Sequence, residues 1–457
     1  MTDIIDSPLR THVENRHGDP VIITGDTHLT WRDLANSIGR LKSWLAENGF
    51  AEGDVLAWVL QGSWRDVALF LACTELGVIF CALNARWPAA ELHQQAKRLG
   101  ARWITTPELA AADDVPHPSP LNDTWQLQRP VSIIFTSGST GEPKAVLHTL
   151  GNHYFNALGS NENISLNPGD SWQLSLPLYH VSGMGIVFRS VIAGSAMVIS
   201  THLNPENLIN NRVTHLSLVS TQFRRLLDEP GVGKLGNQLR AILLGGGPIP
   251  QNLIHAGEKL NLPVFVSYGL SEMASQVATT TPDQADKSRA TILPYREVKI
   301  STDGEILVRG ETLFAGYLLE HGLESARDAQ GWFHTRDVGD MVGKQLQVTG
   351  RLDNQFISGG ENIQPEMIER ALVEVAGIES AVVVPVPDAV FQLRPFAFYT
   401  SDRPVKKEVI RDALRQVLPG YMIPVDYTVL PKALQSGLKP SRKKLTALAV
   451  KRSSQNS

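Results

Sequence analysis

A nine-residue run, Thr136-Ser-Gly-Ser-Thr-Gly-Glu-Pro-Lys144, follows an apolar segment over 131–135 that reads as a buried strand. It combines hydroxyls, glycines and one cation: Thr136, Ser137, Gly138, Ser139, Thr140, Gly141 and Lys144. Glycines allow positive φ values and bring backbone N–H groups close to an anion, and the hydroxyls add donors. The spacing G-x-x-G-x-x-K disfavours a Walker-type kinase or GTPase. A solvated Ser/Gly turn is the other interpretation, but together these residues predict a phosphate-binding loop.

The run resembles the signature loop of the adenylate-forming superfamily, which includes acyl-CoA synthetases, luciferases and peptide-synthetase adenylation domains. Further motifs of that superfamily follow in its order: Tyr268-Gly-Leu-Ser-Glu272, Thr335-Arg-Asp337, Gly350-Arg-Leu-Asp353 and Ser358-Gly-Gly-Glu-Asn-Ile363. The resemblance spans nearly the whole chain. It implies an enzyme that activates a carboxylic acid with ATP and Mg²⁺ and then transfers the acyl group to CoA.

A chain of 457 residues exceeds what one hydrophobic core usually supports, which predicts two or more domains. The resemblance implies a large α/β N-terminal domain over 1–352, with two doubly wound subdomains and a small distorted β-barrel at about 296–349. A smaller, mobile α+β C-terminal domain over 353–457 would follow, with its hinge near Asp353.

Local patterns agree with this α/β organisation. A helix is expected from Thr30, with Asp33 in a capping-box position, and buried strands over 55–60 and 78–83 flank a second helix. The proline- and aspartate-rich segment 106–130 reads as a long surface connection. Further on, the pattern predicts strands at 298–301 and 305–308, a helix opening at Pro365, and a strand over 381–385.

Composition limits the partners and the compartment. A net charge of −4 gives no global attraction to nucleic acid or anionic membrane. Cys73 and Cys81 lie among apolar residues, where buried free thiols are expected. The N-terminus lacks a basic region followed by an apolar core, and no apolar run approaches the length of a membrane span. We expect a cytoplasmic enzyme without a transmembrane segment; the resemblance adds a homo-oligomer as an expectation.

The resemblance assigns nucleotide roles to the second motif. Glu272 is expected to hold Mg²⁺ against the ATP phosphates, because carboxylate oxygens are ligands that Mg²⁺ prefers. Ser271 stands where many relatives have threonine and keeps a hydroxyl that would face the α-phosphate or the adenylate. Tyr268 would stack on adenine. Outside this resemblance, an exposed glutamate and a core tyrosine are the other interpretations.

Three motifs nearer the C-terminus would handle the ribose, the hinge and the CoA step. Asp337 is expected to accept hydrogen bonds from the ribose hydroxyls, assisted by Arg351. Relatives commonly read T-G-D where this chain has Arg336 before the aspartate, and no role is assigned to Arg336. Asp353 resembles the hinge residue, and the backbone at Gly359 and Gly360 would line the CoA channel.

A lysine near the C-terminus completes the catalytic set implied by the resemblance. Lys439 lies in a segment similar to the superfamily's G-K-[IV]-x-R motif, with one extra residue after the glycine. With Thr140 and Glu272 it would stabilise charge during adenylation, entering the site on a mobile lid. Lys443 and Lys444 read as ordinary charges of a basic tail.

Arg189 is the only formally charged residue between Leu174 and Ser200, and it requires an anion. That anion is either a protein carboxylate or a second carboxylate of the substrate, held by the guanidinium fork. Four segments lie around this position in the motif order: Leu176-Pro-Leu-Tyr-His-Val-Ser-Gly183, Ser220-Thr-Gln222, Gly245-Gly-Gly247 and Ser271-Glu-Met-Ala-Ser275. Together they closely resemble the o-succinylbenzoate:CoA ligases of menaquinone (vitamin K2) biosynthesis, which favours the substrate, an aromatic dicarboxylate. That resemblance places the following residues in the acyl pocket: His180, Ser182, Arg189, Ser220, Gly246, Gly247 and Ser271. A satisfied structural histidine remains the alternative for His180.

Three other functions stay open at this point. Another aryl- or fatty-acyl-CoA synthetase would share the nucleotide motifs and differ only in the acyl pocket. An amino-acid adenylation domain is disfavoured because no carrier domain follows. A non-catalytic nucleotide-binding module would be expected to lack Glu272 or Lys439, and both are present.

Overall fold

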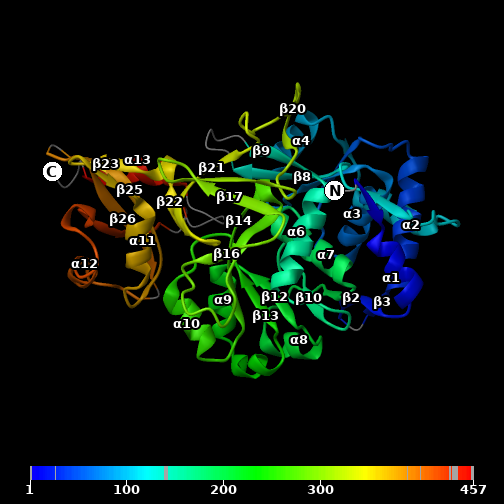
Figure 1. The fold of residues 1–457 in the computed structure, drawn as a ribbon, viewed down its shortest axis with the longest axis horizontal. Helices are drawn as coiled ribbons and strands as arrows, with labels where there is room; N and C mark the ends of the chain where they lie inside the picture. Colours follow the sequence, from blue (N-terminus) through cyan, green and yellow to red (C-terminus); the bar gives the residue numbers. More distant parts are fainter. Residues whose placement is uncertain are drawn as a thin grey trace. The chain divides into compact units, whose positions relative to one another are not determined.

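The computed structural model describes residues 3–25, 27–137, 143–388, 390–401, 403–431, 434 and 441–453. The chain divides into two compact units, both visible in Figure 1. The first unit consists of Met1–Ile249, His255–Val298 and Val308–His334, and the second of Pro250–Ile254, Lys299–Leu307 and Thr335–Ser457.

The first unit contains a sheet with the strand order β20-β19-β9-β8-β5-β4-β6. Its strands are β4 (Val55–Val59), β5 (Ile79–Leu83), β6 (Arg102–Trp103), β8 (Pro130–Ser137), β9 (Pro143–Thr149), β19 (Gly316–Leu319) and β20 (Gly322–Glu324). β6, β4, β5 and β8 run parallel, whereas β8 and β9 form an antiparallel hairpin. The predicted strands at 55–60 and 78–83 are confirmed, and the described ends of the predicted phosphate loop, Thr136 and Lys144, belong to this hairpin.

In a second sheet, the strands of the first unit follow the order β16-β15-β14-β13-β12-β10-β11-β2-β3. They are β2 (Pro20–Thr24), β3 (Thr27–Thr30), β10 (Ser171–Gln173), β11 (Ala196–Val198), β12 (His215–Leu218), β13 (Ala241–Leu244), β14 (Val264–Leu270), β15 (Ser275–Thr279) and β16 (Ala290–Ile292). Leu218, Leu244 and Val266 are in register on parallel strands. The carboxyl ends of β12, β13 and β14 therefore lie on the same side of the sheet. Open α/β sheets bind ligands at the carboxyl ends of their strands.

Helices pack against both sheets. Those that begin before residue 260 are α1 (Pro8–Arg16), α2 (Trp31–Glu47), α3 (Trp64–Leu76), α4 (Ala89–Arg98), α5 (Thr106–Ala110), α6 (Leu150–Asn163), α7 (Val181–Ala193), α8 (Pro205–Asn210), α9 (Ser220–Leu227) and α10 (Gln251–Glu258). The predicted capping box opens α2: the Thr30 hydroxyl accepts from the Asp33 N–H at 3.2 Å, and the Asp33 carboxylate accepts from the Thr30 N–H at 2.9 Å. One core joins strands of both sheets to α2, α3, α6 and α7, and Figure 1 shows α6 and α7 between the sheets.

The prediction that 106–130 is only a surface connection is wrong. The segment contains helix α5 and strand β7 (Thr124–Gln126), which pairs antiparallel with β1 (Ile4–Asp6). Trp125 is buried and donates to the buried carboxylate of Glu75 over 3.0 Å. The prolines and aspartates suggested a loop, but the segment gains a strand partner and an apolar core from distant parts of the chain, which local composition does not reveal.

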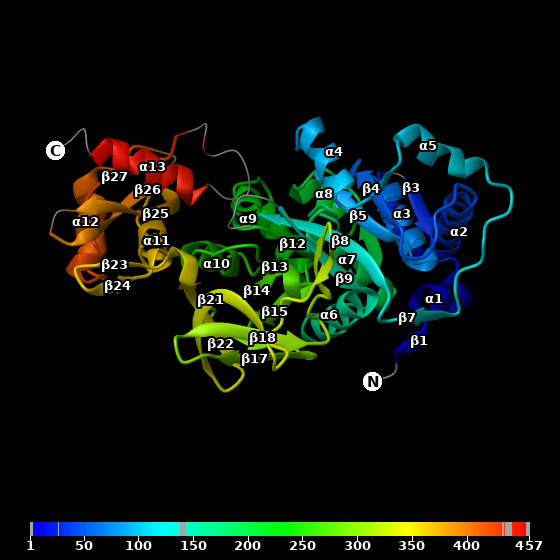
Figure 2. The same cartoon turned by 90° about the horizontal axis from the view of Figure 1, so that it is seen from above.

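The second unit is built around an antiparallel pair, β25 (Ile378–Asp388) and β26 (Gln392–Ser401), with β27 (Tyr427–Val429) parallel to β26. Val383 contributes to a core with α11 (Pro365–Val373) and α12 (Lys407–Arg415), whereas Val384 contributes to a core with α13 (Arg442–Ser453). Figure 2 shows α13 and α11 on opposite faces of this sheet. Alternation along the strand explains the two cores. The predicted helix at Pro365 and strand over 381–385 are confirmed.

Six further strands precede α11 in the chain. They are β17 (Arg296–Ile300), β18 (Glu305–Gly310), β21 (Phe333–Val342), β22 (Gln345–Arg351), β23 (Phe356–Ser358) and β24 (Glu361–Ile363). β17 and β18 are neighbours, as predicted, and β21 pairs antiparallel with β22.

Two predictions from composition can be compared with the structure. Cys73 and Cys81 are buried free thiols, and burial raises the pKa of Cys81 to about 12. Thiols of this kind remain protonated and unreactive. Across the described ranges, we find no helix with the length and apolar character needed to cross a membrane.

Candidate functional site

The β8–β9 hairpin carries the described ends of the predicted phosphate loop. Thr136 pairs with Lys144 across the hairpin, and the Lys144 ammonium lies 4.6 Å from the ring centroid of Tyr317. Gly138, Ser139, Thr140 and Gly141, together with the side chain of Ser137, lie outside the described residues.

The turn after β14 holds the second motif. Gly269 has no room for a side chain, because a Cβ there would lie 2.0 Å from the carbonyl oxygen of Ser275. Ala274 and Ser275 follow with φ values of 53° and 124°, which non-glycine residues rarely adopt. Such strain gathers at functional sites when the surrounding structure holds it in place.

Two distant side chains hold this turn. The Tyr317 hydroxyl donates to Oε1 of Glu272 over 2.8 Å, and the Phe314 N–H donates to the Glu272 carbonyl, also over 2.8 Å. Nε2 of the buried His148 lies 2.7 Å from the Ser271 carbonyl oxygen. Burial lowers the pKa of His148 to about 4, so the ring is neutral at pH 7 and donates this hydrogen bond from Nε2.

Glu272 suits a magnesium ion that arrives with a nucleotide. Among the residues that the structure describes, no three His, Cys, Asp or Glu side chains are grouped as a metal site. Mg²⁺ often binds through one or two carboxylates together with substrate phosphates. A single carboxylate next to the predicted phosphate loop fits that pattern.

Arg189 lies in α7 and is 1% exposed. Its guanidinium lies 5.2 Å from the Trp172 ring centroid and donates one long hydrogen bond, 3.4 Å, to the Ser275 hydroxyl. Its Nε has no hydrogen-bond partner, and no carboxylate of the described chain forms an ion pair with it. Burial lowers the pKa of Arg189 to about 9, which still leaves the group charged at pH 7. An isolated buried cation is costly unless an anion joins it.

A second buried arginine, Arg296, adds positive charge to the same interior. Its guanidinium donates to the carbonyl oxygens of Gln276, Pro294 and Asn156. Burial, and next the charge of Arg189, lower the pKa of Arg296 to about 9. Among the described residues, Arg296 therefore donates to three carbonyl oxygens, whereas Arg189 donates one long hydrogen bond to a hydroxyl.

Three other predicted pocket residues, Ser220, Gly246 and Gly247, lie near the carboxyl ends of parallel strands, together with Tyr268, which is predicted to stack on adenine. Ser220, Gly246 and Tyr268 each follow a registered residue of β12, β13 or β14 by two positions, so adjacent strands bring them close together. Gly246 has a φ of 81°, and Gly247 comes next.

His180 and Ser182 lie at the start of α7, the helix that carries Arg189. Burial, and next the charge of Arg86, lower the pKa of His180. Its ring lies 4.7 Å from that of Tyr179 and makes no hydrogen bond with the described residues. This differs from a satisfied structural histidine.

In the second unit, the residues predicted to bind the ribose and to act as the hinge form one charged cluster. Asp337 and Arg351 are opposite each other on β21 and β22, with Nη1 of Arg351 2.7 Å from Oδ1 of Asp337. The other arm of Arg351 lies 3.2 Å from Asp353. Arg336, with no predicted role, lies 3.1 Å from the same Asp353 carboxylate. Arg336 has a φ of 63°, where glycine is favoured.

Gly359 and Gly360 follow β23 in the second unit and have φ values of 59° and 89°. A Cβ at Gly359 would lie 2.6 Å from the Phe391 ring, so any larger residue would displace that ring. Lys439 lies outside the described residues.

Sequence reasoning missed Tyr317, His148 and Arg296. No local motif marked them, because each acts through a partner far along the chain; the Tyr317–Glu272 bond joins residues 45 positions apart. The sequence offered only the residue types as a signal: Tyr317 follows a glycine, and His148 and Arg296 each follow an apolar segment.

Comparison with known proteins identifies the family. The sequence pattern of the AMP-binding enzymes matches residues 9–128 and 106–318, and that of the AMP-binding enzyme C-terminal domain matches residues 367–436. The chain belongs to the AMP-binding enzyme family. A relative from Salmonella typhimurium named 2-succinylbenzoate--CoA ligase is 35% identical over 448 residues, which cover 96% of this chain and 97% of the relative.

Solved structures agree with the family. The o-succinylbenzoate CoA synthetase (MenE) from Bacillus subtilis in complex with the acyl-adenylate intermediate OSB-AMP has a TM-score of 0.86 and 29% identity, covering 97% of this chain and 98% of that one. The Bacillus subtilis enzyme in complex with ATP and magnesium ion has a TM-score of 0.82 and 29% identity, covering 93% and 96%. The expected fold, a large α/β domain followed by a smaller α+β domain, is confirmed.

Proposed function

We propose that this chain is an AMP-forming o-succinylbenzoate:CoA ligase. It converts o-succinylbenzoate, ATP and CoA into o-succinylbenzoyl-CoA, AMP and pyrophosphate, a step of menaquinone biosynthesis. Within the family, the observation that supports this substrate is Arg189, a buried guanidinium without a carboxylate partner among the described residues. A substrate with two carboxylates activates one and leaves the other for this cation.

In the first half-reaction, a succinyl carboxylate oxygen attacks the α-phosphorus of ATP, the bond to the bridging oxygen breaks, and pyrophosphate leaves. The loop from Thr136 to Lys144, which includes Thr140, binds the phosphates. Lys439 stabilises the negative charge that develops at the α-phosphate in the transition state. Glu272 would hold Mg²⁺, which neutralises phosphate charge. Ser271 faces the adenylate.

The adenine and the ribose of ATP are bound by residues of different motifs. Tyr268 stacks on adenine, and Asp337 accepts hydrogen bonds from the ribose hydroxyls with the help of Arg351. In the structure Asp337 already accepts from Arg351 over 2.7 Å, so the carboxylate is oriented before the sugar arrives. This support reduces the ordering that binding requires.

In the second half-reaction, the CoA sulfur attacks the acyl carbon, the bond to the AMP oxygen breaks, and the thiol proton is released. Residues 353–457 act as a lid on the AMP- and acyl-binding domain 1–352 and rotate about Asp353. The rotation withdraws Lys439 and presents Gly359 and Gly360 to the pantetheine arm, where their lack of side chains allows a close approach.

The acyl pocket is proposed to contain Arg189, His180, Ser182, Ser220 and the backbone at Gly246 and Gly247. Arg189 holds the benzoate carboxylate, the one that is not activated. The main alternative is another aryl- or fatty-acyl-CoA synthetase, whose monoacid substrate would leave Arg189 without an anion. The buried charge of Arg189 argues against that alternative.

The test measures acid-dependent release of AMP and pyrophosphate with ATP, Mg²⁺ and CoA. The acids are o-succinylbenzoate, benzoate and a medium-chain fatty acid, and the proteins are the wild type and Arg189→Ala. Loss of the charged contact should lower kcat/KM for the dianion roughly 100-fold. Arg65→Ala is the matched control, because Arg65 forms an exposed ion pair with Asp113. Equal rates with a monoacid, together with an indifferent Arg189→Ala, would refute the substrate assignment.

A further inference from the structure

Tyr317 contacts residues of two different nucleotide motifs. Its hydroxyl donates to Oε1 of Glu272 over 2.8 Å, and its ring centroid lies 4.6 Å from the Lys144 ammonium. The residue is 9% exposed, so these contacts are largely shielded from water. One side chain therefore touches both the carboxylate proposed for Mg²⁺ and the lysine proposed for phosphate.

Strand pairing places Tyr317 there. In β19, Tyr317 pairs with Val146 of β9. Lys144 precedes Val146 by two residues and thus lies on the same face of the sheet, as a diagonal neighbour of Tyr317. The adjoining segment is tied on two sides, because the Phe314 N–H donates to the Glu272 carbonyl at 2.8 Å and the Ala315 N–H donates to the Leu147 carbonyl at 2.9 Å.

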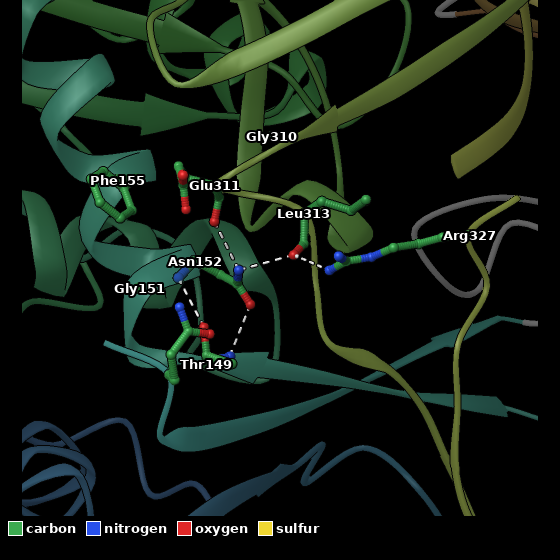
Figure 3. A pocket seen from close by; sticks show the side chains of 9 residues that line it. Thr149, Gly151, Asn152, Phe155, Gly310, Glu311, Leu313 and Arg327 are labelled. Atoms are coloured by element: carbon green, nitrogen blue, oxygen red, sulfur yellow. Dashed lines mark hydrogen bonds between the residues drawn. The ribbon is translucent and has the colours of Figure 1, made fainter. Parts of the chain in front are cut away.

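The chain just before Tyr317 is held by side chains from elsewhere in the first unit, shown in Figure 3. Asn152 in α6 donates to the carbonyls of Glu311 and Leu313, at 2.8 and 2.9 Å. Arg327 donates to the carbonyls of Leu313 and Phe314, at 3.3 and 2.9 Å. These groups surround a polar pocket of about 180 Å³. With its carbonyls fixed, the segment presents Tyr317 from a rigid support.

We propose that Tyr317 is a positioning residue for the bound ATP and its metal. Its hydroxyl holds Oε1 of Glu272, which leaves Oε2 for Mg²⁺, and its ring holds the Lys144 ammonium until phosphate binds. This inference rests on the proposed use of ATP and Mg²⁺ by the chain.

Both halves of the phenol side chain contribute. Burial, and next the charge of Glu272, raise the pKa of Tyr317, so the hydroxyl keeps its proton and remains a donor. A carboxylate that is already oriented loses less conformational freedom when it binds a metal. The ring face attracts the lysine cation, as aromatic faces do.

Calorimetric titration of ATP without any acid substrate tests the hydroxyl and the ring separately. Tyr317→Phe keeps the ring, so ATP affinity in EDTA should equal that of the wild type. The additional affinity that Mg²⁺ provides should fall roughly 10-fold. Tyr317→Leu removes the ring as well and should also weaken ATP binding in EDTA.

Tyr295→Phe is the matched control, because the Tyr295 hydroxyl also donates to a carboxylate, that of Glu162, over 3.2 Å. Both of its ATP affinities should stay unchanged. Against a Glu272→Gln background, Tyr317→Phe should cause no further loss of the Mg²⁺ effect, because the two changes act on one interaction. This double-mutant cycle of Tyr317→Phe and Glu272→Gln tests the positioning role of the hydroxyl even when Tyr317→Leu does not fold.

Two negative outcomes are distinguishable. A wild-type Mg²⁺ effect in Tyr317→Phe would overturn the positioning role and leave the proposed function intact. Absence of any Mg²⁺-dependent ATP binding by the wild type would refute the proposed function, and the role of Tyr317 would fall with it.

Discussion

Two buried arginines of the first unit are chemically alike but differently satisfied. Within the described parts of the chain, Arg296 donates to three backbone carbonyls, whereas Arg189 donates one long hydrogen bond and its Nε has no partner. Both keep their charge at pH 7, since burial lowers the pKa of each only to about 9. Interior charge without compensation destabilises the folded chain. This difference is the reason for the proposal that Arg189 binds an anion of a ligand, whereas Arg296 supports the fold.

Replacing each arginine by methionine should change stability in opposite directions. Arg189→Met removes an uncompensated charge and should stabilise the unliganded chain by about 1 kcal/mol or more, while dianion activation is lost. Arg296→Met removes the charged donor to three carbonyl oxygens, those of Gln276, Pro294 and Asn156, and should destabilise the chain by roughly 3 kcal/mol. Urea unfolding of both variants without ligand provides the measurement. Destabilisation by both would show that Arg189 is structural.

The buried histidines His148 and His153 couple folding to pH. Burial lowers the pKa of His148 to about 4, from an ordinary value of 6.5, and lowers that of His153 well below 6.5. The unfolded chain therefore takes up protons near pH 6.5, whereas folded His148 does not until about pH 4. Stability should fall as the pH drops through this window, by about 1 kcal/mol per pH unit for each histidine.

His148→Gln tests this coupling. Glutamine does not titrate and can still donate to the Ser271 carbonyl, so the variant should lose one histidine's share of the slope between pH 6.5 and 4.5. Urea midpoints measured at several pH values give that slope. An unchanged slope would mean that His148 does not contribute.

At the scale of elements, the antiparallel strands β21 and β22 place Asp337 opposite Arg351 and bring Arg336 to Asp353. The cost is a non-glycine residue at a φ of 63°, where L side chains are disfavoured by roughly 1 kcal/mol. Glu305 supports this backbone by accepting from the Arg336 N–H at 2.8 Å. Because the Arg336–Asp353 pair is exposed, it contributes little to stability.

Two substitutions of Arg336 separate the backbone strain from the ion pair. Arg336→Gly and Arg336→Ala both remove the pair, but only glycine relieves the strain, so the glycine variant should be the more stable by about 1 kcal/mol. Thermal unfolding compares the two proteins directly. Equal stabilities would mean that the left-handed conformation is not strained at this position.

At the scale of the whole molecule, the proposed chemistry draws on residues of two units. The first unit carries the β8–β9 hairpin, Glu272 and Arg189, and the second carries Asp337 and the proposed hinge residue Asp353. An enzyme that performs two half-reactions with a mobile lid needs different lid residues in each. The roles of the lid residues can therefore be separated by measuring each half-reaction alone.

Lys439→Ala should slow adenylation, measured as ATP–pyrophosphate exchange, roughly 100-fold, because a charge that stabilises the transition state is lost. Thioester formation from preformed acyl-adenylate and CoA should stay within a few-fold of the wild type. Lys443→Ala and Lys444→Ala are the controls for the charge of the tail. If the rates of both half-reactions fell equally, Lys439 would not be specific to adenylation.

The sequence offers candidates for much of the site because the chemistry of each motif is local. Glycines, hydroxyls and a lysine in one run suit phosphate binding, and the resemblance of this run to a family signature favours that interpretation over a solvated turn. The run of valines at 382–384 predicts a strand. The structure of segment 106–130 could not be predicted in this way, because strand β7 forms by pairing with β1, which lies near the N-terminus.

By itself, the sequence determined the family motifs, their order and the residue types available for phosphate, metal and ribose. Only the tertiary structure decided how charges and donors are partnered: Arg189 has no carboxylate partner among the residues that the structure covers, Tyr317 contacts Glu272, and Arg336 contacts Asp353. The physical reason is that hydrogen bonds and ion pairs act over a few ångströms in space. Strand pairing brings such partners together from distant positions, and no short sequence pattern specifies the result.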